Sequence, residues 1–398
     1  MPPTLASTLM SKLVKRTPFS SDNLKQAWID PSVLTIVMII GGDIVQVALA
    51  QLTGSFYTPV PFSFGWVAYS FTSLILSVGE NKLMPNSDCS CMLINTKSHH
   101  GRAVGSWIIG RIMRDYEYWQ PRRVKEEVER ILDEGTERDR TKARRKAQEK
   151  GIEYVEPARR RQAGLCVSFY KSPGARAGVP MRDWVYWTGV IVTIVQFGIS
   201  IIPWILDGDW TIFMYTASGT LLAILAGAIP QWKHEKWECR RSKKRVALTR
   251  GNGAQHVIII DGVDDNSLDL EDLASGIGSP RKETRYYCAI LSFIWIAYLV
   301  TVSGNLDNPW YLLAVGGIGM IQNVFVAGVP RRTEAFGIYL ELTDIIAKPL
   351  VMDTLKEVEN RFPGVGASLV STFFPGKLRP DDVVWWDEAE KRLTQNKR

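Results

Sequence analysis

Apolar residues along this chain are gathered into six runs, and the charged residues fill the intervals between them. A helix needs about 20 mostly apolar residues to cross roughly 30 Å of hydrocarbon. Six stretches meet this requirement: 33–52, 61–78, 184–206, 211–229, 286–302 and 309–329. The pattern therefore predicts an all-α polytopic membrane protein with six transmembrane helices.

The connectors inside each pair of spans indicate the orientation. LTGSFYTPVP, DGDW and SGNLDN contain no Lys or Arg, so the basic residues lie in the termini and the two long connectors. Under the positive-inside rule these basic parts are cytoplasmic. We therefore expect three in-out-in hairpins (33–78, 184–229 and 286–329), with both termini in the cytoplasm of an endomembrane or plasma membrane. The expected cytoplasmic segments are 1–32, 79–183, 230–285 and 330–398.

The cytoplasmic segments carry secondary-structure signals of their own. Residues 106–119 are amphipathic, which suits a helix on the membrane surface or one packed against the bundle. The run 121–150 alternates charges of both signs, as a solvated helix does. RVALT and AQHVIIIDG, separated by Asn252-Gly253, predict a small β-hairpin. After Pro349, apolar residues at helical spacing predict a helix in the 330–398 tail; they are Val351, Leu355, Val358 and Phe362. Together these parts form a cytoplasmic cap in the predicted fold.

Composition refines this picture only slightly. The 398 residues are 46% hydrophobic with a mean hydropathy of −0.04, an average that conceals the division into apolar and charged parts. The net charge of +7 is mostly a topology signal, and no nucleic-acid partner is expected because acids are interleaved with the bases. The expected partner is the lipid bilayer, with anionic lipids at basic segments such as WKHEKWECRRSKKR.

Asp43 is the most informative residue for function. It lies in the middle of the first predicted span, where an ionised carboxylate costs about 3 kcal/mol. It is a candidate catalytic general acid, an ion-coupling site, or a hydrogen-bonded strut between helices. Its expected intramembrane polar partners are Gln46, Gln196, Gln322 and Asn323.

Two spans have faces of small residues at helical spacing. These are Gly316, Gly317 and Gly319 in 309–329, and Thr216, Thr220, Ala223 and Gly227 in 211–229. Such faces favour close helix packing, with a cavity lining as the alternative.

No cofactor or metal is expected. Cys89 and Cys91 are followed by His99 and His100, but this spacing fits no established zinc site. A strand rather than a helix follows the RGNG turn, which argues against a phosphate-binding loop. With cysteines in the cytoplasm and the membrane, no disulfide is expected, and reversible palmitoylation is the more plausible cysteine chemistry.

The segments GGDIVQVALAQLTG, TPVPFSFGWVAYSF, GENKLMP and FPGKLRPDDVVWW resemble a family of fungal integral membrane proteins without an assigned activity. The resemblance covers the first predicted hairpin and the tail, and it implies a fungal source without a mechanism. A second comparison is with fungal membrane-bound terpene cyclases, which use an intramembrane acid to protonate a prenyl chain. Asp43 would be that acid, although the DDxxD motif of prenyltransferases is absent from the spans.

A single midplane acid without a catalytic set favours a non-enzymatic protein that handles or organises a lipid or small molecule. The alternative is a membrane-embedded enzyme on an isoprenoid or lipid substrate, with Asp43 as general acid. A small-molecule transporter is the third hypothesis.

Overall fold

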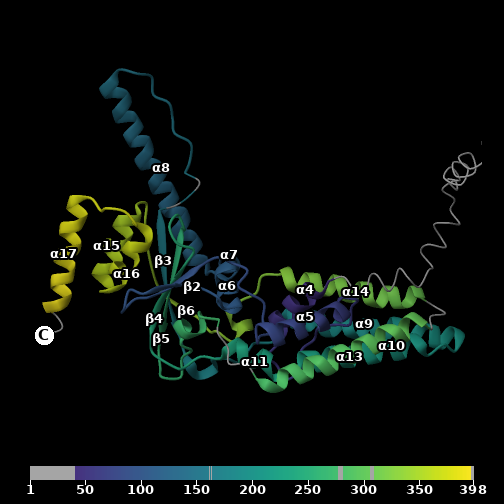
Figure 1. Cartoon of the computed structure of the whole chain (residues 1–398). Coiled ribbons are helices and arrows are strands. Elements are labelled where there is room, and N and C mark those ends of the chain that lie inside the picture. The colour runs from purple at the N-terminus through teal and green to yellow at the C-terminus, as the bar shows by residue number, and fades with distance from the viewer. Residues whose placement is uncertain (1–40, 161, 163, 277–280, 305–308, 396–398) are drawn as a thin grey trace, which may run out of the picture.

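The computed structural model describes residues 41–160, 162, 164–276, 281–304 and 309–395. It is mostly helical, with a bundle of long helices on one side and a mixed β-sheet on the other (Figure 1). Four helical stretches are long and apolar enough to cross a membrane: Trp184–Asp207, Thr211–Trp237, Lys282–Val302 and Pro309–Gly328. They coincide with the third to sixth predicted spans. Of these four stretches, Trp184–Asp207 is α9 and Pro309–Gly328 is α14. The stretch Thr211–Trp237 contains α10 (Thr211–Gly227) and α11 (Pro230–Trp237), and Lys282–Val302 lies in α13 (Lys282–Gly304).

The first two predicted spans differ from this pattern. Their helices, α4 (Gly42–Leu52) and α5 (Gly65–Gly79), have 11 and 15 residues, fewer than the roughly 20 needed to cross the hydrocarbon. Residues 33–40 of the first predicted span lie outside the described part of the chain. Within the described residues the structure therefore supports four spans and not six.

The connector between α4 and α5 lies at the bundle end that faces the sheet. Lys236 of α11 donates hydrogen bonds to the carbonyl oxygens of Ala50 and Thr53, both at 2.8 Å, and Arg182 contacts Ser55. The end of α5 lies at this same end, because Glu235 accepts hydrogen bonds from the backbone N–H groups of Leu83 and Met84. The predicted first in-out-in hairpin, with LTGSFYTPVP on the far side, is wrong in this structure.

The directions of neighbouring helices agree with this correction. α4 runs parallel to α14: Gly41 packs against Met320, and Gln51 binds the carbonyl oxygen of Val329. α5 runs antiparallel to α13, since Ser292 binds the carbonyl oxygen of Ser70 and Arg285 binds that of Ser77. α4 and α5 thus both end toward the sheet. A simple hairpin would need α4 and α5 to be antiparallel. Here an extended segment, residues 58–64, leads the chain from the end of α4 back to the start of α5.

The sheet is larger than the predicted hairpin. Its six strands stand in the order β2-β1-β4-β5-β3-β6, and only the β3–β5 pair is parallel. The strands are β1 (Met92–Asn95), β2 (Gly101–Ala103), β3 (Leu165–Ser172), β4 (Arg245–Thr249), β5 (His256–Gly262) and β6 (Glu341–Lys348). The predicted β4–β5 hairpin is confirmed, with Arg245 opposite Asp261 and Thr249 opposite Val257. The description of the fold as all-α with a small hairpin is corrected to a helical bundle joined to a six-stranded mixed sheet.

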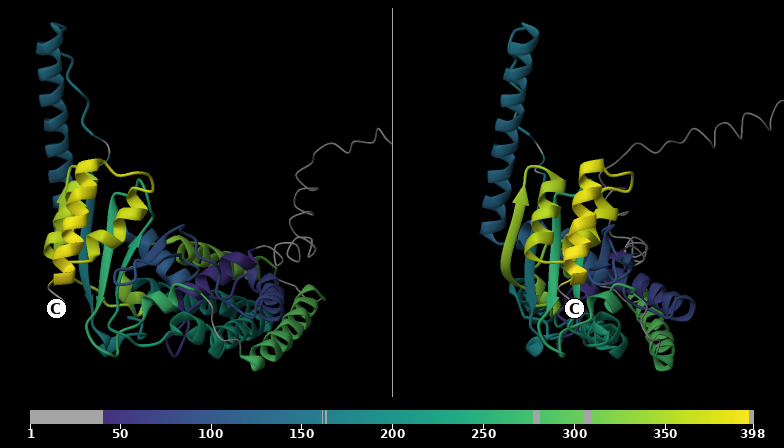
Figure 2. Two further views of the ribbon diagram at one scale, coloured as in Figure 1. Left: turned by 60° about the vertical axis from the view of Figure 1, so that its left-hand side comes forward. Right: turned by 90° about the vertical axis from the view of Figure 1, so that its left-hand side faces the viewer.

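Both faces of the sheet are covered, which explains why its strands are apolar on both sides. Helices α15 (Val351–Arg361) and α16 (Val365–Phe373) cover one face of the sheet (Figure 2). Val167, Phe169 and Ile259 of the sheet share a buried apolar cluster with residues of these helices. On the other face Cys166, Tyr170 and related residues belong to a core that continues through α6 (Trp107–Arg114) and α7 (Tyr116–Trp119) into the bundle. One continuous core therefore joins the sheet to the membrane helices.

The remaining predicted elements keep their positions. The amphipathic stretch forms α6 and α7, and the apolar side chains of α6 and Tyr116 of α7 are buried, which supports packing against the bundle. The charge run forms α8 (Arg122–Lys150), which projects from the sheet (Figures 1 and 2). The tail helix is α15, followed by α16 and by α17 (Pro380–Gln395). Short elements are α12 (Leu270–Leu273) and the 3-10 turns Gly174–Arg176 and Thr333–Phe336.

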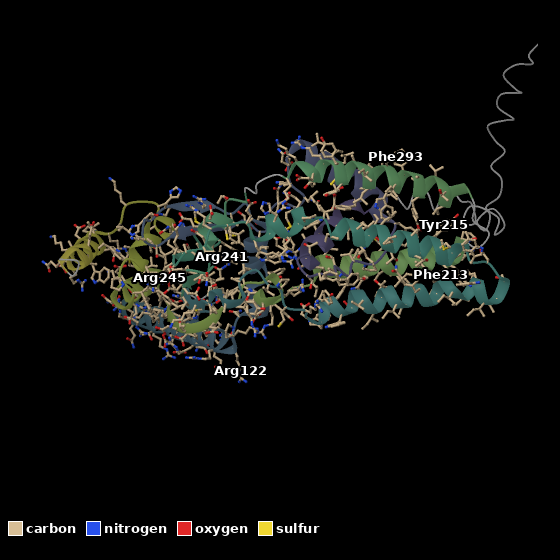
Figure 3. All side chains as sticks on the ribbon, turned by 90° about the horizontal axis from the view of Figure 1, so that it is seen from below. Arg122, Phe213, Tyr215, Arg241, Arg245 and Phe293 are labelled. Atoms are coloured by element: carbon tan, nitrogen blue, oxygen red, sulfur yellow. The ribbon has the colours of Figure 1, made fainter. Side chains whose placement is uncertain are left out.

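Charge and apolar surface separate along the long axis. The labelled Arg122, Arg241 and Arg245 lie over the sheet side, whereas Phe213, Tyr215 and Phe293 lie along the helices (Figure 3). Trp204 and Trp210, near the far end of the bundle, are about half exposed. This suits a bilayer around the helices with water around the sheet.

Cysteine labelling in sealed vesicles tests the corrected connector. With Cys89 and Cys239 replaced by Ser, Phe56→Cys should react with a membrane-impermeant maleimide from the same side as Glu153→Cys. Asp207→Cys should react only from the opposite side. Phe56 is fully exposed, and its connector is held at the sheet end of the bundle. If Phe56→Cys instead reacted from the same side as Asp207→Cys, the in-out-in arrangement of the first hairpin would be correct.

Candidate functional site

Asp43 does not gather the polar partners predicted for it. It lies in the first turn of α4, and its side chain is exposed in the part of the chain that the structure describes. The neighbouring Gly41 packs against Met320, near the middle of α14. Gly41 also lies close to Gly65, so the first turns of α4 and α5 meet beside Asp43. The Asp43 carboxylate therefore lies in the first turn of α4, where the helix dipole favours a negative charge.

The four predicted amide partners are engaged elsewhere. Gln46 donates to the carbonyl oxygen of Leu83 at 2.8 Å, and Gln322 donates to the Thr188 hydroxyl at 2.8 Å. Gln196 donates to the carbonyl oxygens of Phe62 and Val315, at 2.6 and 2.8 Å. Asn323 donates to the Ser63 hydroxyl at 2.9 Å. Each amide therefore ties together parts of the bundle that are distant in sequence.

Two of these amides hold a buried extended segment, residues 58–64, which returns the chain from the sheet end to the start of α5. Every residue of this segment is buried. Its backbone needs internal hydrogen-bond partners, because lipid offers none. The indole of Trp66 and the amide of Gln196 donate to the carbonyl oxygens of Pro61 and Phe62. Pro59 and Pro61 have no N–H group, which lowers the number of donors that need a partner.

Glycines of the surrounding helices make room for this segment. A Cβ atom at Gly319 would lie 1.8 Å from the carbonyl oxygen of Phe62, and one at Gly189 would lie 2.1 Å from that of Pro59. Gly316 and Gly219 pack against the rings of Phe64 and Phe62. The small-residue faces predicted from the sequence thus serve close packing, but much of that packing is against an extended chain.

A buried ionic junction fastens the bundle to the sheet. The ammonium group of Lys236, 1% exposed, caps the last carbonyl groups of α4. Beside it the Arg331 guanidinium binds the carbonyl oxygen of Gln51 at 2.6 Å and both carboxylate oxygens of Asp183. Asp183 in turn accepts the Tyr186 N–H at the start of α9. Cations at helix C-termini and an acid at an N-terminus satisfy both free backbone groups and the helix dipoles.

Helix α6 contributes to the same junction at the end of α14. Arg111 donates to the carbonyl oxygen of Ala327 at 2.8 Å and pairs with Asp88. Burial is the main cause that lowers the pKa of Arg111 to about 10, although Asp88 opposes this shift. Arg114 reaches the carbonyl oxygen of Gly328. Sequence reasoning missed this junction, although Lys236 and Arg331 directly follow spans and their position was a usable signal.

The sheet domain contains a cavity of about 660 Å³ between the β4–β5 turn, α7 and the first turns of α8. Its lining includes two cations, Lys125 and Arg250, and two acids, Glu117 and Glu129. His256 and Gln120 also line it, and the His256 Nδ1 and Gln120 Oε1 atoms are buried without a hydrogen-bond partner among the described residues. A cavity of this size lined by convergent polar and charged side chains is typical of a small-molecule site.

The cavity rests on a rigid polar base. The Tyr116 ring packs edge-on against the His256 ring, with centroids 5.0 Å apart, and its hydroxyl is 2.7 Å from the Ser168 hydroxyl. Burial raises the pKa of Tyr116 well above its ordinary value, so this phenol stays protonated. Burial is also the main cause that lowers the pKa of His256, which favours the neutral imidazole. A neutral His256 can accept a hydrogen bond from a ligand through Nδ1.

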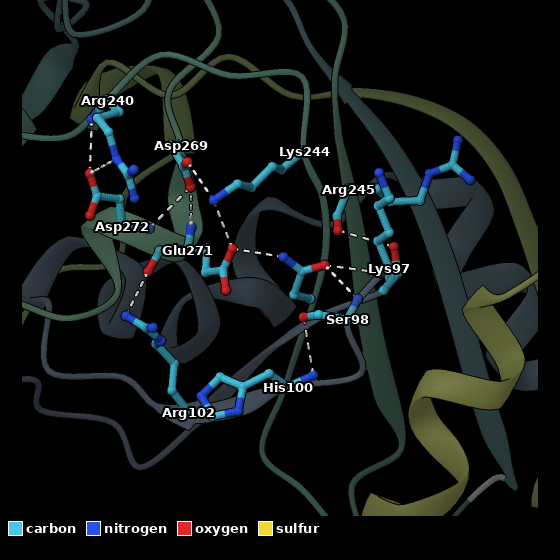
Figure 4. Close-up of polar contacts among 12 residues, drawn as sticks. Lys97, Ser98, His100, Arg102, Arg240, Lys244, Arg245, Asp269, Glu271 and Asp272 are labelled. Atoms are coloured by element: carbon cyan, nitrogen blue, oxygen red, sulfur yellow. Dashed lines mark hydrogen bonds and ion pairs between the residues drawn. The ribbon is translucent and has the colours of Figure 1, made fainter.

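A second polar cluster has a structural role (Figure 4). Lys244 pairs with Asp269 at 2.8 Å and with Glu271 at 2.9 Å, and Glu271 also accepts a hydrogen bond from Asn95. Burial is the largest single influence on the pKa of Asp269 and would raise it, but the hydrogen bonds from Lys244, the Asp272 N–H and Ser242, together with the charge of Lys244, outweigh burial and lower the pKa. These contacts hold α12 against β1 and β4. They leave the cluster's charges paired with one another.

Among the described residues, no group of three or more His, Cys, Asp or Glu side chains is placed to hold a metal ion. The five cysteines are free thiols in the structure, and Cys89 and Cys239 are partly exposed. Burial raises the pKa of Cys91 to about 12, which keeps this thiol protonated. Of the five cysteines, Cys89 and Cys239 are therefore the accessible ones.

Two glycines of α14 give a matched test of the extended segment. Gly319→Ala should lower the free energy of unfolding by about 1–3 kcal/mol, because the new methyl group meets the carbonyl oxygen of Phe62. Gly317→Ala is the control, since no atom lies within 4 Å of a Cβ there. Thermal unfolding of the purified protein in detergent measures both. Equal unfolding temperatures for the two variants would show that the segment does not pack against Gly319.

Comparisons with known proteins return no matching family model, no matching curated protein and no matching solved structure. The expectation of a fungal source therefore continues to rest on the sequence resemblance. The functional argument rests on the geometry of this chain.

Proposed function

We propose that this protein is a multi-pass membrane protein of non-enzymatic function that handles a small polar molecule in the cavity beside His256. The four apolar helices are compatible with an integral membrane protein. The observation that carries the proposal is the lining of this cavity, which combines charges of both signs with the polar residues His256 and Gln120. We place the sheet domain in the cytoplasm, in agreement with the positive-inside rule.

The lining favours binding over bond-breaking chemistry. Of the described residues that line the cavity, none is a Ser, Thr or Cys, so the usual nucleophiles are missing from its described wall. Lys125 and Arg250 suit a carboxylate or phosphate, while Glu117 and Glu129 suit an amine. A small amphoteric or anionic metabolite fits this set best. The helices then serve as the membrane anchor of a binding domain.

A thermal-shift screen of the purified full chain tests this proposal. The probes are amino acids, dicarboxylates and sugar phosphates, and a ligand should raise the unfolding temperature. Arg250→Ala should weaken binding of that ligand about tenfold or more, because a charge-assisted hydrogen bond contributes about 1.5–3 kcal/mol. Arg145→Ala, a change on the exposed outer part of α8, should bind like the wild type. A ligand that binds both variants equally would place its site elsewhere.

The enzyme hypothesis is supported by the position of Asp43 in the first turn of α4, two residues after Gly41, which packs beside the middle of α14. It would act there as a general acid on an isoprenoid or lipid substrate. We also keep the transporter hypothesis, in which Asp43→Asn would abolish substrate flux in sealed vesicles.

We expect Asp43→Asn to leave the abundance and unfolding temperature of the protein unchanged, because the four amides predicted as partners of Asp43 form hydrogen bonds with other groups. Quantitative blotting of membranes and thermal unfolding measure this, with Gly319→Ala as the destabilised comparison. Loss of the protein itself would make Asp43 a structural strut. Normal abundance with a lost lipid product in membranes would favour the enzyme.

A further inference from the structure

The outer surface of the bundle has an apolar groove between the α10–α11 corner and α13. Its volume is about 320 Å³, at the lower end for ligand sites. The lining residues are Leu225, Ala228, Ile229, Pro230, Tyr287, Ile290, Leu291 and Ile294. The groove runs along one face of α13, because its four lining residues there recur at intervals of three, one and three. It lies in membrane-spanning helices, so the hydrocarbon of the bilayer surrounds it.

The end of the groove nearest the sheet is polar and mainly basic. The Gln231 side chain accepts hydrogen bonds from the Arg281 N–H and the Thr284 hydroxyl, so α11 and α13 begin side by side. Lys233 is exposed and lies one helical turn beyond Pro230, on the same face of α11. Arg281 and Lys282 are exposed at the start of α13 beside the acid Glu283, and Gln231 also donates to the Glu235 carboxylate at 2.7 Å. Three cations against these two acids leave this end positive.

Aromatic residues mark the depth of this end. Tyr286 is 72% exposed and Tyr287 is 48% exposed, although both belong to an apolar helix. Tyr at this position is typical of the membrane–water interface, where the ring is in apolar surroundings and the hydroxyl reaches water. The groove thus begins at headgroup level and continues about 10 Å into the hydrocarbon, by the 1.5 Å rise of α13 between Tyr287 and Ile294.

We propose that this groove binds one anionic phospholipid, with an acyl chain along Ile290 and Ile294 and the phosphate group beside Lys233. The apolar groove ends in cations at the depth of the membrane–water interface. A phospholipid has the matching arrangement, an apolar acyl chain joined to an anionic phosphate group. A second copy of the chain would bring its own exposed α13 start, and the basic ends would repel each other. This site is separate from the cavity beside His256, so either proposal can fail alone.

Native mass spectrometry of the full chain in mild detergent tests the proposal, with phosphatidylserine and phosphatidylcholine added in turn. The wild type should retain a phosphatidylserine molecule. Ile290→Trp fills the groove and should reduce that adduct about fivefold, an effect equal to losing about 1 kcal/mol. Phe293→Trp is the matched control, because Phe293 is 73% exposed on the same helix but does not line the groove (Figure 3).

A second pair of variants tests the interaction of the lipid headgroup with Lys233. Lys233→Glu should reduce the preference for phosphatidylserine over phosphatidylcholine about fivefold or more, since each basic residue near an anionic surface contributes about a fivefold factor. Lys150→Glu, at the end of α8, should keep the preference. Equal adducts for Ile290→Trp and Phe293→Trp would overturn the site. So would equal retention of the two lipids by the wild type, stabilisation by inorganic phosphate alone, or a dimer that Ile290→Trp dissociates.

Discussion

The structure of the bundle depends on keeping an extended chain inside a medium that offers no hydrogen bonds. Residues 58–64 have no helix to satisfy their backbone, so side chains of other helices must do it. Gln196 binds the carbonyl oxygen of Phe62, and Asn323 binds the Ser63 hydroxyl. Because these amides are committed to the segment, they are not available to Asp43. The same constraint places glycines where the segment passes closest, as at Gly319.

A second constraint operates where the bundle meets the sheet. Helix ends leave carbonyl groups free, and the buried Lys236 and Arg331 side chains supply donors for those of α4. Arg111 does the same at the end of α14. These cations are distant in sequence from the helix ends that they cap. The sheet is therefore fastened to the bundle by buried hydrogen bonds as well as by a continuous apolar core.

The helical bundle and the sheet domain use their polar residues differently. In the bundle, the four amides predicted as partners of Asp43 form hydrogen bonds between segments that are distant in sequence. In the sheet domain, His256 and Gln120 keep polar atoms unused beside charged groups of both signs. On the lipid-facing side, an apolar groove ends in basic residues near Lys233. The two candidate ligand surfaces proposed for the described residues are thus the sheet cavity and the groove on the bundle exterior.

The sequence by itself determined four of the spans, the charged helix α8, the β4–β5 hairpin and the tail helix, because each depends on a local periodicity or turn. It also contained the apolar runs of β3 and β6, flanked by Gly164 and by Pro349, which could have been identified as strands. Only the tertiary structure decided the path of residues 53–64, the partners of the four amides and the cavity beside His256. Most of these contacts join residues more than a hundred positions apart, such as Gln196 with Phe62, and hydropathy along the chain does not indicate which residues meet.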